Sequence, residues 1–326
     1  MGNRQGGAER AIGPREETVV RCKDGREYLR VHPLERESVR VLCVCLHGGY
    51  GNFRRFRRDV GEQFENFERK DAVITYPNAI DGHWNDGRLE SDKPRTDVEF
   101  LASVIRSERE RYRSVRTVVL TGHSNGAMMN FQMMLCAQGL VDVFAPVCGL
   151  LPKWQGGMRL PKVVKRVKVI LIVGLRDNLI PATGGSVGRF FRGGATESRW
   201  GKRADTRAKR KRGEVRSLSV TCSALERMLG VSLGASKRLE SENTYTAKSR
   251  TSADGRLRVI TIDETGHAWP GSRTSAFSLV MGQVLGQTAT FSAGKEILTF
   301  ALPEAGGTSD VSRRSVSKKT EPRDEN

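Results

Sequence analysis

The feature that most constrains the fold is a series of short apolar runs separated by helical segments. The runs are rich in β-branched residues, and several are apolar almost throughout, as strands covered on both faces are. Six of them stand out, at residues 39–46, 72–77, 116–122, 143–149, 167–174 and 257–263. Strands that alternate with helices form βαβ units, so the sequence predicts an α/β fold with a mostly parallel sheet flanked by helices.

Three segments between the runs have helical patterns. Residues 96–112 begin with the capping-box spacing of Thr96 and Glu99 and carry an apolar stripe at helical spacing. Residues 126–140 are rich in Met and Ala and apolar nearly all round, which predicts a buried helix. A further helix is expected near residues 217–230.

The two ends of the chain differ from its middle in composition. Residues 1–17 and 303–326 are rich in Gly, Arg, Ser and Glu, with few large apolar groups, so both are expected to be disordered tails. The residues between them, 18–302, are expected to form a single domain. A long insertion near residues 186–216 interrupts the alternation of strands and helices.

The formal net charge of +18 raises the question of an anionic partner. The excess concentrates in residues 199–216, with nine Lys and Arg against two acids. A solvated loop is the simplest interpretation; an anion-binding lip and a nuclear-type address at residues 209–212 are the alternatives. Because this segment has no interleaved aromatic residue beyond Trp200, a nucleic-acid partner is not expected.

The remaining composition places the chain among soluble proteins without a metal centre. No stretch reaches 18 apolar residues and no early apolar run fits a signal peptide, so we expect no membrane span and a cytoplasmic location. The six cysteines form no C-x-x-C pair and no metal-ligand spacing with the five histidines. Buried free thiols are therefore expected rather than disulfides.

One serine stands between two glycines where a predicted strand ends and a helix begins. The stretch is "VVLTGHSNGAMMN", with Ser124 flanked by Gly122 and Gly126. A strand that leads into G-x-S-x-G and then into a helix is a nucleophile elbow, which presents a strained serine above the sheet. An ordinary turn is the alternative. In a nucleophile elbow, the N–H of Asn125, the residue after the serine, can point at an oxyanion.

A nucleophilic serine needs a base, and the base needs an acid that orients it. In this architecture the chain order is serine, then acid, then histidine, each just past the carboxyl end of a strand. His267 is the only histidine after Ser124. Asp177 follows the run at 167–174 and fits the second place, with Asp263 and Glu264 as alternatives.

The stretch "LHGGYGN" at residues 46–52 follows the first strong strand. Its glycines allow the backbone to turn so that an N–H from Gly49 or Tyr50 supplies the other half of an oxyanion hole. A Gly-rich turn without chemistry is the alternative. His47 is expected to shape this hole and the adjoining pocket.

Taken in order, these stretches resemble the polyhydroxybutyrate depolymerase/feruloyl esterase-type family of α/β hydrolases. The resemblance spans about residues 18–300 and includes "ITYPNAIDGHWNDGR", "VLTGHSNGAMM", "VGLRDNLIPATGG" and "DETGHAWPGS". It implies an α/β-hydrolase fold, with Ser124 as nucleophile, Asp177 as acid, His267 as base, and Trp84 and Trp269 near the substrate pocket.

The chain departs from the family at Val173, where a His-Gly pair is usual, and in its charged insertion; relatives are often secreted. We expect hydrolysis of a small-molecule or polymeric carboxylic ester without a metal or organic cofactor. A thioesterase or peptidase with the same triad is the alternative within enzymes. An inert hydrolase scaffold that binds nucleic acid through its basic segment is the alternative from another class.

Overall fold

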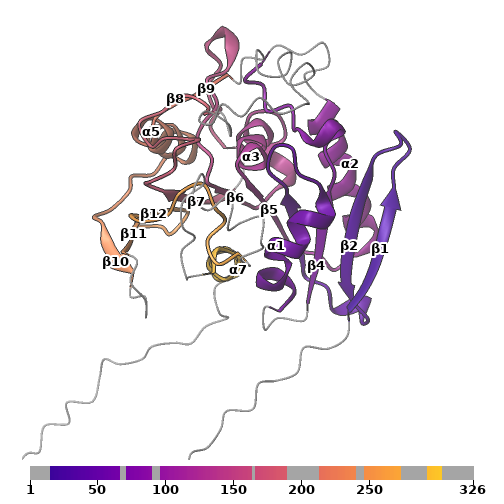
Figure 1. The fold of residues 1–326 in the computed structure, drawn as a ribbon. Coiled ribbons are helices and arrows are strands. Elements are labelled where there is room, and N and C mark those ends of the chain that lie inside the picture. Colours follow the sequence, from indigo (N-terminus) through magenta and orange to yellow (C-terminus); the bar gives the residue numbers. More distant parts are fainter. Residues whose placement is uncertain are drawn as a thin grey trace, which may run out of the picture.

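The computed structural model describes residues 15–66, 71–89, 96–163, 166–188, 213–239, 246–272 and 292–302. They build one ten-stranded sheet with helices packed on it (Figure 1). Its strands are β1 (Arg15–Arg21), β2 (Glu27–Pro33), β3 (Val41–Leu46), β4 (Ala72–Pro77), β5 (Thr117–His123), β6 (Val143–Val147), β7 (Lys168–Gly174), β10 (Lys237–Leu239), β11 (Ala247–Thr251) and β12 (Leu257–Ile262). Their order is β1-β2-β4-β3-β5-β6-β7-β12-β11-β10.

The centre of the sheet is parallel and both of its edges are antiparallel. β4, β3, β5, β6, β7 and β12 run parallel to one another. β1 and β2 close one edge and β11 and β10 the other, all in antiparallel pairs. A separate two-stranded sheet joins β8 (Gly185–Ser186) to β9 (Glu214–Val215). The parallel centre brings the carboxyl ends of β3, β5, β7 and β12 to the same edge.

Five helices of the described part accompany the sheet: α1 (Phe53–Glu65), α2 (Thr96–Arg111), α3 (Asn125–Cys136), α5 (Leu218–Leu229) and α7 (Ala293–Ala301). Buried residues of α2, α3 and α5 share one apolar cluster, and those of α1 and α7 share a second. Alternate residues of β3 divide between the clusters, with Leu42 in the first and Cys43 in the second. The central strand is therefore covered on both faces, as its continuous apolar sequence predicts.

The predicted parallel core is confirmed. The strands β3, β4, β5, β6, β7 and β12 match the six predicted runs to within two residues at each end. Helices α2 and α5 lie where expected. The expected helix at 126–140 ends as an α-helix at Cys136, and a 3₁₀ turn over Gln138–Leu140 follows it.

The antiparallel edges and helix α1 have no counterpart in the predictions. Residues 15–17 belong to β1, so the expected disordered tail is wrong at its last three positions. β1 is an edge strand with a polar sequence, held by main-chain pairing to β2, and it has no core pattern to recognise. Residues 1–14 and 303–326, and residues 189–212 of the expected insertion, lie outside the described residues.

All six cysteines are free. Cys43, Cys45, Cys148 and Cys222 are buried as expected, whereas Cys22 is half-buried and Cys136 is exposed. Among the described helices, none combines the length and the apolar character that a bilayer crossing needs.

Candidate active site

Ser124 occupies the turn between β5 and α3. Its φ of 56° and ψ of −115° lie in a region that residues with a Cβ rarely adopt. The Ser124 N–H donates to the carbonyl of Val147 on β6 at 3.0 Å, and its carbonyl accepts from the N–H of Met128 on α3 at 2.9 Å. The turn is thus fixed on both sides, and the hydroxyl stands at the carboxyl edge of the sheet.

The two glycines flanking the serine are required by close backbone approach. A Cβ on Gly122 would lie 2.6 Å from the carbonyl carbon and oxygen of Gly126. A Cβ on Gly126 would lie 2.6 Å from the carbonyl oxygens of Leu46 and His47. Both distances are shorter than real Cβ contacts, so only glycine lets β3, β5 and α3 meet at this point. These contacts favour the nucleophile elbow over an ordinary turn.

His267 connects Ser124 to Asp177. Its Nε2 lies 2.7 Å from the Ser124 Oγ, and its Nδ1 lies 2.7 Å from the Asp177 Oδ2. Asp177 follows β7, and His267 follows β12, two strands that are neighbours in the sheet. A carboxylate only accepts, so a neutral imidazole carries its proton on Nδ1 and its Nε2 accepts from the serine hydroxyl.

The carboxylate of Asp177 is held in place by its own loop. Its Oδ1 accepts from the N–H groups of Leu179 at 2.8 Å and Ile180 at 2.7 Å, which leaves Oδ2 for His267. The two alternative acids are engaged elsewhere. Asp263 pairs with Lys248 at 3.1 Å, and Glu264 pairs with Arg176 at 2.8 Å, both at more exposed positions. The geometry therefore joins Asp177, and neither alternative, to the imidazole.

The glycine loop after β3 lies against the elbow. A Cβ on Gly48 would be 3.5 Å from the Cβ of Ser124, and one on Gly49 would be 3.6 Å from the Cβ of Asn125. Asn125 is the first residue of α3, so its N–H has no acceptor within the helix. The N–H of Tyr50 donates to the carbonyl of Gly82 at 2.7 Å. The expectation that Tyr50 offers its N–H to an oxyanion is therefore wrong, and Gly49 stays the candidate in this loop.

The three residues expected at the substrate pocket are buried within the protein instead. His47 is 1% exposed, Trp84 0% and Trp269 3%. The Trp84 indole donates to the carbonyl of His47 at 2.9 Å, and the Trp269 indole donates to Oε1 of Gln63 on α1 at 3.0 Å. Their polar atoms are satisfied internally, so they support the loops around the serine and do not form an open wall.

Burial lowers the pKa of His47 to about 4, although its hydrogen bond with the Gly48 carbonyl opposes that shift. The neutral form fits the contacts: Nε2 accepts from the N–H of Ala79 at 3.1 Å, and Nδ1 donates to the Gly48 carbonyl at 2.8 Å. A protonated ring has no lone pair for the Ala79 N–H. His47 is thus a structural residue of the glycine loop.

The stability of the protein should depend on pH through His47. The imidazole of His47 binds a proton near pH 6.5 in the unfolded chain and only near pH 4 in the folded chain. Acidification through this range therefore favours unfolding. We expect wild type to lose about 3 kcal/mol more than His47→Gln between pH 6.5 and pH 4, from about 1.4 kcal/mol per pKa unit. Urea unfolding across this range measures the difference. Equal pH slopes for the two proteins would contradict the assignment.

Two further groups near the serine have no signal in the sequence patterns. The ring of His123 lies 4.9 Å from that of His267, and burial, followed by electrostatic repulsion from His267, holds the pKa of His123 well below its ordinary value. Cys148 follows β6, and its Sγ lies 3.2 Å from the carbonyl of Ala268, the residue after His267. A single histidine beside Ser124 in the chain, or a single cysteine after a strand, does not reveal which distant residue it contacts.

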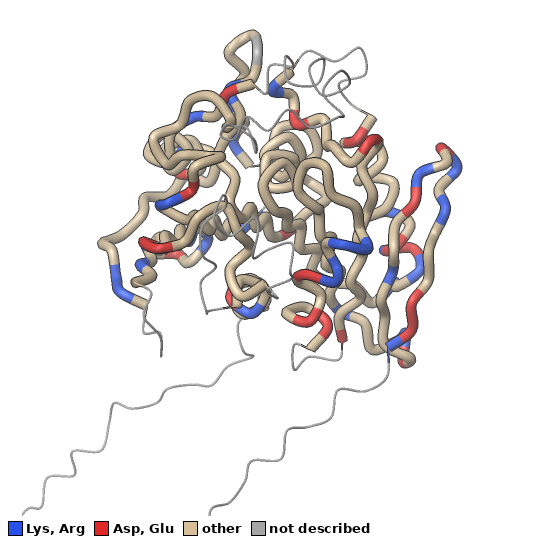
Figure 2. The backbone as a smooth tube through the Cα atoms, in the orientation of Figure 1, with Lys and Arg blue, Asp and Glu red and all other residues tan. Residues whose placement is uncertain are grey.

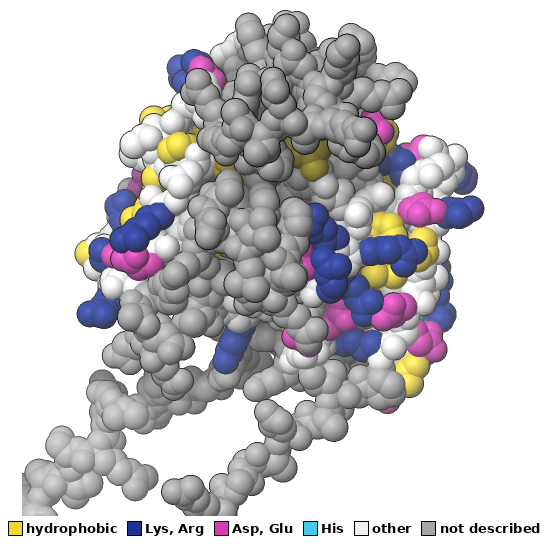
Figure 3. All heavy atoms as spheres, in the orientation of Figure 1, with side chains coloured by type: hydrophobic (Ala, Val, Ile, Leu, Met, Phe, Trp, Pro, Cys, Tyr) yellow, Lys and Arg dark blue, Asp and Glu magenta, His cyan; other side chains and the backbone are white. Residues whose placement is uncertain are grey.

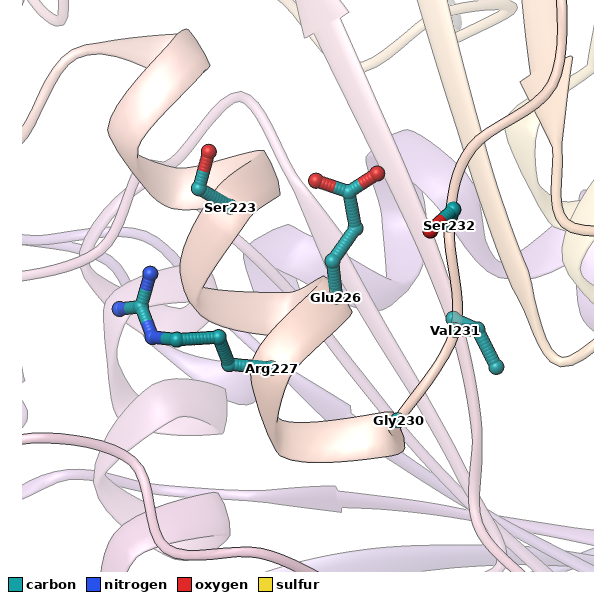
Figure 4. Close-up of a pocket in the computed structure, with 6 residues that line it drawn as sticks. All are labelled: Ser223, Glu226, Arg227, Gly230, Val231 and Ser232. Carbon is teal, nitrogen blue, oxygen red and sulfur yellow. The ribbon is translucent and has the colours of Figure 1, made fainter.

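One other feature of the described part, a surface hollow, lies apart from this site. Figure 4 shows a surface hollow lined by Ser223, Glu226, Arg227, Gly230, Val231 and Ser232, at the end of α5 and the segment after it. It contains no residue of the Ser124 constellation, and its Glu226 is bonded to the N–H of Leu233 at 2.7 Å. Within the described ranges, no group of three or more His, Cys, Asp or Glu is arranged to hold a metal ion.

No protein-family model and no curated protein sequence matches the chain. Among solved structures, it is similar to an acetyl xylan esterase from Aspergillus awamori, with a TM-score of 0.53 and 13% identity, over 82% of this chain and 98% of that one. A mutant of the feruloyl esterase module from Clostridium thermocellum, complexed with sinapinate, aligns with a TM-score of 0.39 and 14% identity over 51% of this chain and 68% of that one. With its parallel centre and the likeness to the first of these structures, the chain has the α/β-hydrolase fold.

Proposed function

We propose that this protein is a serine hydrolase that cleaves carboxylic esters through Ser124, His267 and Asp177. The observation that supports it most is the pair of 2.7 Å contacts that His267 makes, one to the serine hydroxyl and one to the carboxylate. A nucleophile, a base and an orienting acid within hydrogen-bond reach are the arrangement that activates a serine for acyl transfer.

In the proposed reaction, the Ser124 Oγ attacks the ester carbonyl carbon while its proton passes to the Nε2 of His267. The carbonyl oxygen becomes an oxyanion, which the N–H groups of Asn125 and Gly49 stabilise. The C–O bond to the alcohol then breaks, and the imidazolium gives its proton to the departing alkoxide. Water attacks the acyl-enzyme in the same way, with His267 as base, and releases the acid and the free serine.

The substrate class is inferred from sequence motifs. The stretches "GHSNGAMM" and "GHAWPG", which contain Ser124 and His267, resemble those of the polyhydroxybutyrate depolymerase/feruloyl esterase-type family. They favour a polyhydroxyalkanoate, feruloyl, acetyl or similar acyl ester as substrate. A thioesterase or peptidase would use the same three residues, since the leaving group is selected by the walls of the pocket.

The charge of the described surface favours an enzyme over a nucleic-acid-binding scaffold. Figure 2 shows basic and acidic residues next to one another along α1 and the β1–β2 hairpin, and Figure 3 shows side chains of both signs on this side of the molecule. Arg57, for example, pairs with Glu65 at 2.8 Å and with Glu17 at 2.6 Å. A face of mixed sign lacks the one-sided positive field that nucleic acid requires. The basic segment lies mostly outside the described residues, at 199–212.

A fluorophosphonate probe tests the proposal without knowledge of the natural substrate. We expect the Oγ of Ser124 to bond to phosphorus, fluoride to leave, and mass spectrometry to find the adduct on Ser124 alone. The acid-unfolded protein, in which the three residues are apart, serves as the control and should stay unlabelled. Absence of labelling in the folded protein, or labelling at another serine, would contradict the proposed nucleophile.

The same preparation can separate the reaction classes. An aryl ester, a thioester and an anilide with one acyl group differ only in the leaving group. We expect the highest kcat/KM for the oxygen ester. A higher kcat/KM for the thioester or the anilide would leave Ser124 as the proposed nucleophile but would change the proposed substrate class.

A further inference from the structure

Residues 79–86, here called the brace segment, connect the two loops that flank the serine. On one side the segment is joined to the elbow by the side chain of Asn125. The N–H of Trp84 donates to the Asn125 Oδ1 at 2.7 Å, and the Asn125 Nδ2 donates to the carbonyl of Trp84 at 2.9 Å and to the Asp86 Oδ2 at 2.7 Å. All three polar partners of this amide belong to the brace segment, and the side chain is buried.

On its other side the brace segment is joined to the glycine loop. The Trp84 indole donates to the carbonyl of His47 at 2.9 Å, and the N–H of Ala79 donates to the Nε2 of His47 at 3.1 Å. The same carbonyl would lie 2.6 Å from a Cβ on Gly126, so it is wedged between the indole and the first turn of α3. The N–H of Tyr50 donates to the carbonyl of Gly82 at 2.7 Å.

The far end of the brace segment is held by the body of the protein. The Trp154 indole donates to the carbonyl of Asp86 at 2.9 Å, and Arg88 pairs with the Asp86 carboxylate at 2.8 Å. The N–H of Asn85 donates to Asp97 of α2 at 2.6 Å, and Asp97 pairs with Arg26 at 2.7 Å. The segment is therefore fixed independently of the two loops that it joins.

We propose that Trp84 is a positioning residue that holds the two amide donors of the oxyanion site at a fixed separation. The inference rests on the proposed function, because it concerns the N–H groups of Asn125 and Gly49. The backbone of Trp84 fixes Asn125, and its indole fixes the His47 carbonyl, whose peptide plane leads into the Gly48–Gly49 turn. The positions of both N–H donors thus depend on hydrogen bonds of a single buried residue.

The physical reason lies in how an oxyanion site works. Its donors stabilise charge that develops only in the transition state, so they act at full strength only when they are held at the oxyanion position beforehand. A displaced donor lowers kcat, whereas the affinity for the uncharged ester, and with it KM, changes little. Loss of a donor itself costs about 10²–10³ in kcat. Loss of its support costs less.

The test compares Trp84→Phe with Trp154→Phe. Both variants replace a buried tryptophan with a smaller ring and remove one indole N–H that donates to a main-chain carbonyl at 2.9 Å. The acceptor is the carbonyl of His47 for Trp84 and the carbonyl of Asp86 for Trp154. For Trp84→Phe we expect kcat on an aryl ester to fall roughly tenfold with KM within about twofold. In Trp154→Phe the Asp86 carboxylate keeps Arg88 and the Asn85 N–H keeps Asp97, so the far end of the brace segment stays held and both constants should stay within about threefold of wild type.

An aryl trifluoromethyl ketone gives a second measurement on the same proteins. It adds the Ser124 Oγ to its carbonyl carbon and forms a hemiketal oxyanion, while the serine proton moves to His267. Trp84→Phe should weaken its binding by the same factor as kcat/KM, since both depend on the oxyanion donors. Trp154→Phe should bind it as wild type does.

Asn125→Ala provides an independent variant, because it keeps the Asn125 N–H and removes the three side-chain hydrogen bonds. It should repeat the fall in kcat at constant KM, and it decides the question if Trp84→Phe does not fold. Equal kcat losses in the two tryptophan variants, or a loss confined to KM, would overturn the positioning role. If Ser124→Ala is inactive, such a result would overturn only the role of Trp84 and leave the proposed function in place. An active Ser124→Ala protein would instead overturn the proposed function itself.

Discussion

Replacement of Ser124 by alanine is expected to lower kcat on short-chain aryl esters by about 10⁴–10⁶-fold. Alanine has no atom at the place of the Oγ that lies 2.7 Å from the Nε2 of His267, so no acyl-enzyme can form. Steady-state assays on the purified variant measure the loss. The remaining rate should show no burst of the alcohol product.

The fold should survive this change, which makes the assay interpretable. The main-chain bonds of Ser124, to Val147 and from Met128, do not involve the hydroxyl. The thermal midpoint should therefore lie near that of wild type. Ser114→Ala is a matched control, since its Oγ donates to the carbonyl of Val39 at 2.7 Å in the turn before β5, at the end of that strand opposite Ser124. A folded Ser124→Ala protein with wild-type turnover would refute the nucleophile.

Replacement of Asp177 by asparagine is expected to lower kcat by roughly 10⁴-fold, because it imposes the wrong histidine tautomer. Oδ1 accepts from the N–H groups of Leu179 and Ile180, so the amide oxygen of the variant will take that place. The amide NH₂ then faces the Nδ1 of His267, which must accept. The proton of the neutral ring moves to Nε2, which can no longer accept from the hydroxyl of Ser124.

Asp263→Asn is the matched control for this prediction. It makes the same change at a carboxylate near His267 in sequence that pairs with the exposed Lys248. We expect its kcat to stay within about threefold of wild type. Fluorophosphonate labelling of Asp177→Asn should slow in parallel with its kcat. A larger loss for Asp263→Asn than for Asp177→Asn would show that the acid is misassigned.

The parallel core of the fold can be predicted from the sequence because it depends on the local pattern of apolar residues. A strand covered on both faces must be apolar at successive positions, as "VLCVCL" and "VILIVG" are in β3 and β7. An edge strand such as β1 needs only main-chain partners, so "REETVVR" carries no such pattern. Helix α1 does carry an apolar stripe at Phe53, Phe56, Val60 and Phe64, but arginines between these positions obscure it.

The three candidate catalytic residues follow from chain order for the same reason. Ser124, Asp177 and His267 each come just after a strand of the parallel centre, and parallel strands end at one edge. Topology brings such residues to one place whatever their separation along the chain. The choice among three nearby acids has no such rule, because it depends on the direction in which each side chain points.

The surroundings of the serine show where local sequence stops being sufficient. Trp84 and Trp269 stand in stretches that suggest a pocket wall, yet each donates its indole N–H inside the protein, and the partner of Trp269 is Gln63 on α1. Tyr50 follows the glycine pair, yet its N–H is bonded to Gly82. In each case the partner comes from a distant part of the chain.

By itself, then, the sequence determined the parallel sheet, the glycine-flanked turn at Ser124 and the order in which Ser124, Asp177 and His267 follow their strands, because hydrophobic period and strand ends are local properties of the chain. The tertiary structure alone decided which carboxylate meets His267, which N–H groups stay available beside Ser124, and that Trp84 lies in the core. Those outcomes depend on hydrogen bonds between segments far apart in the chain, and such bonds are made or lost only when the elements pack.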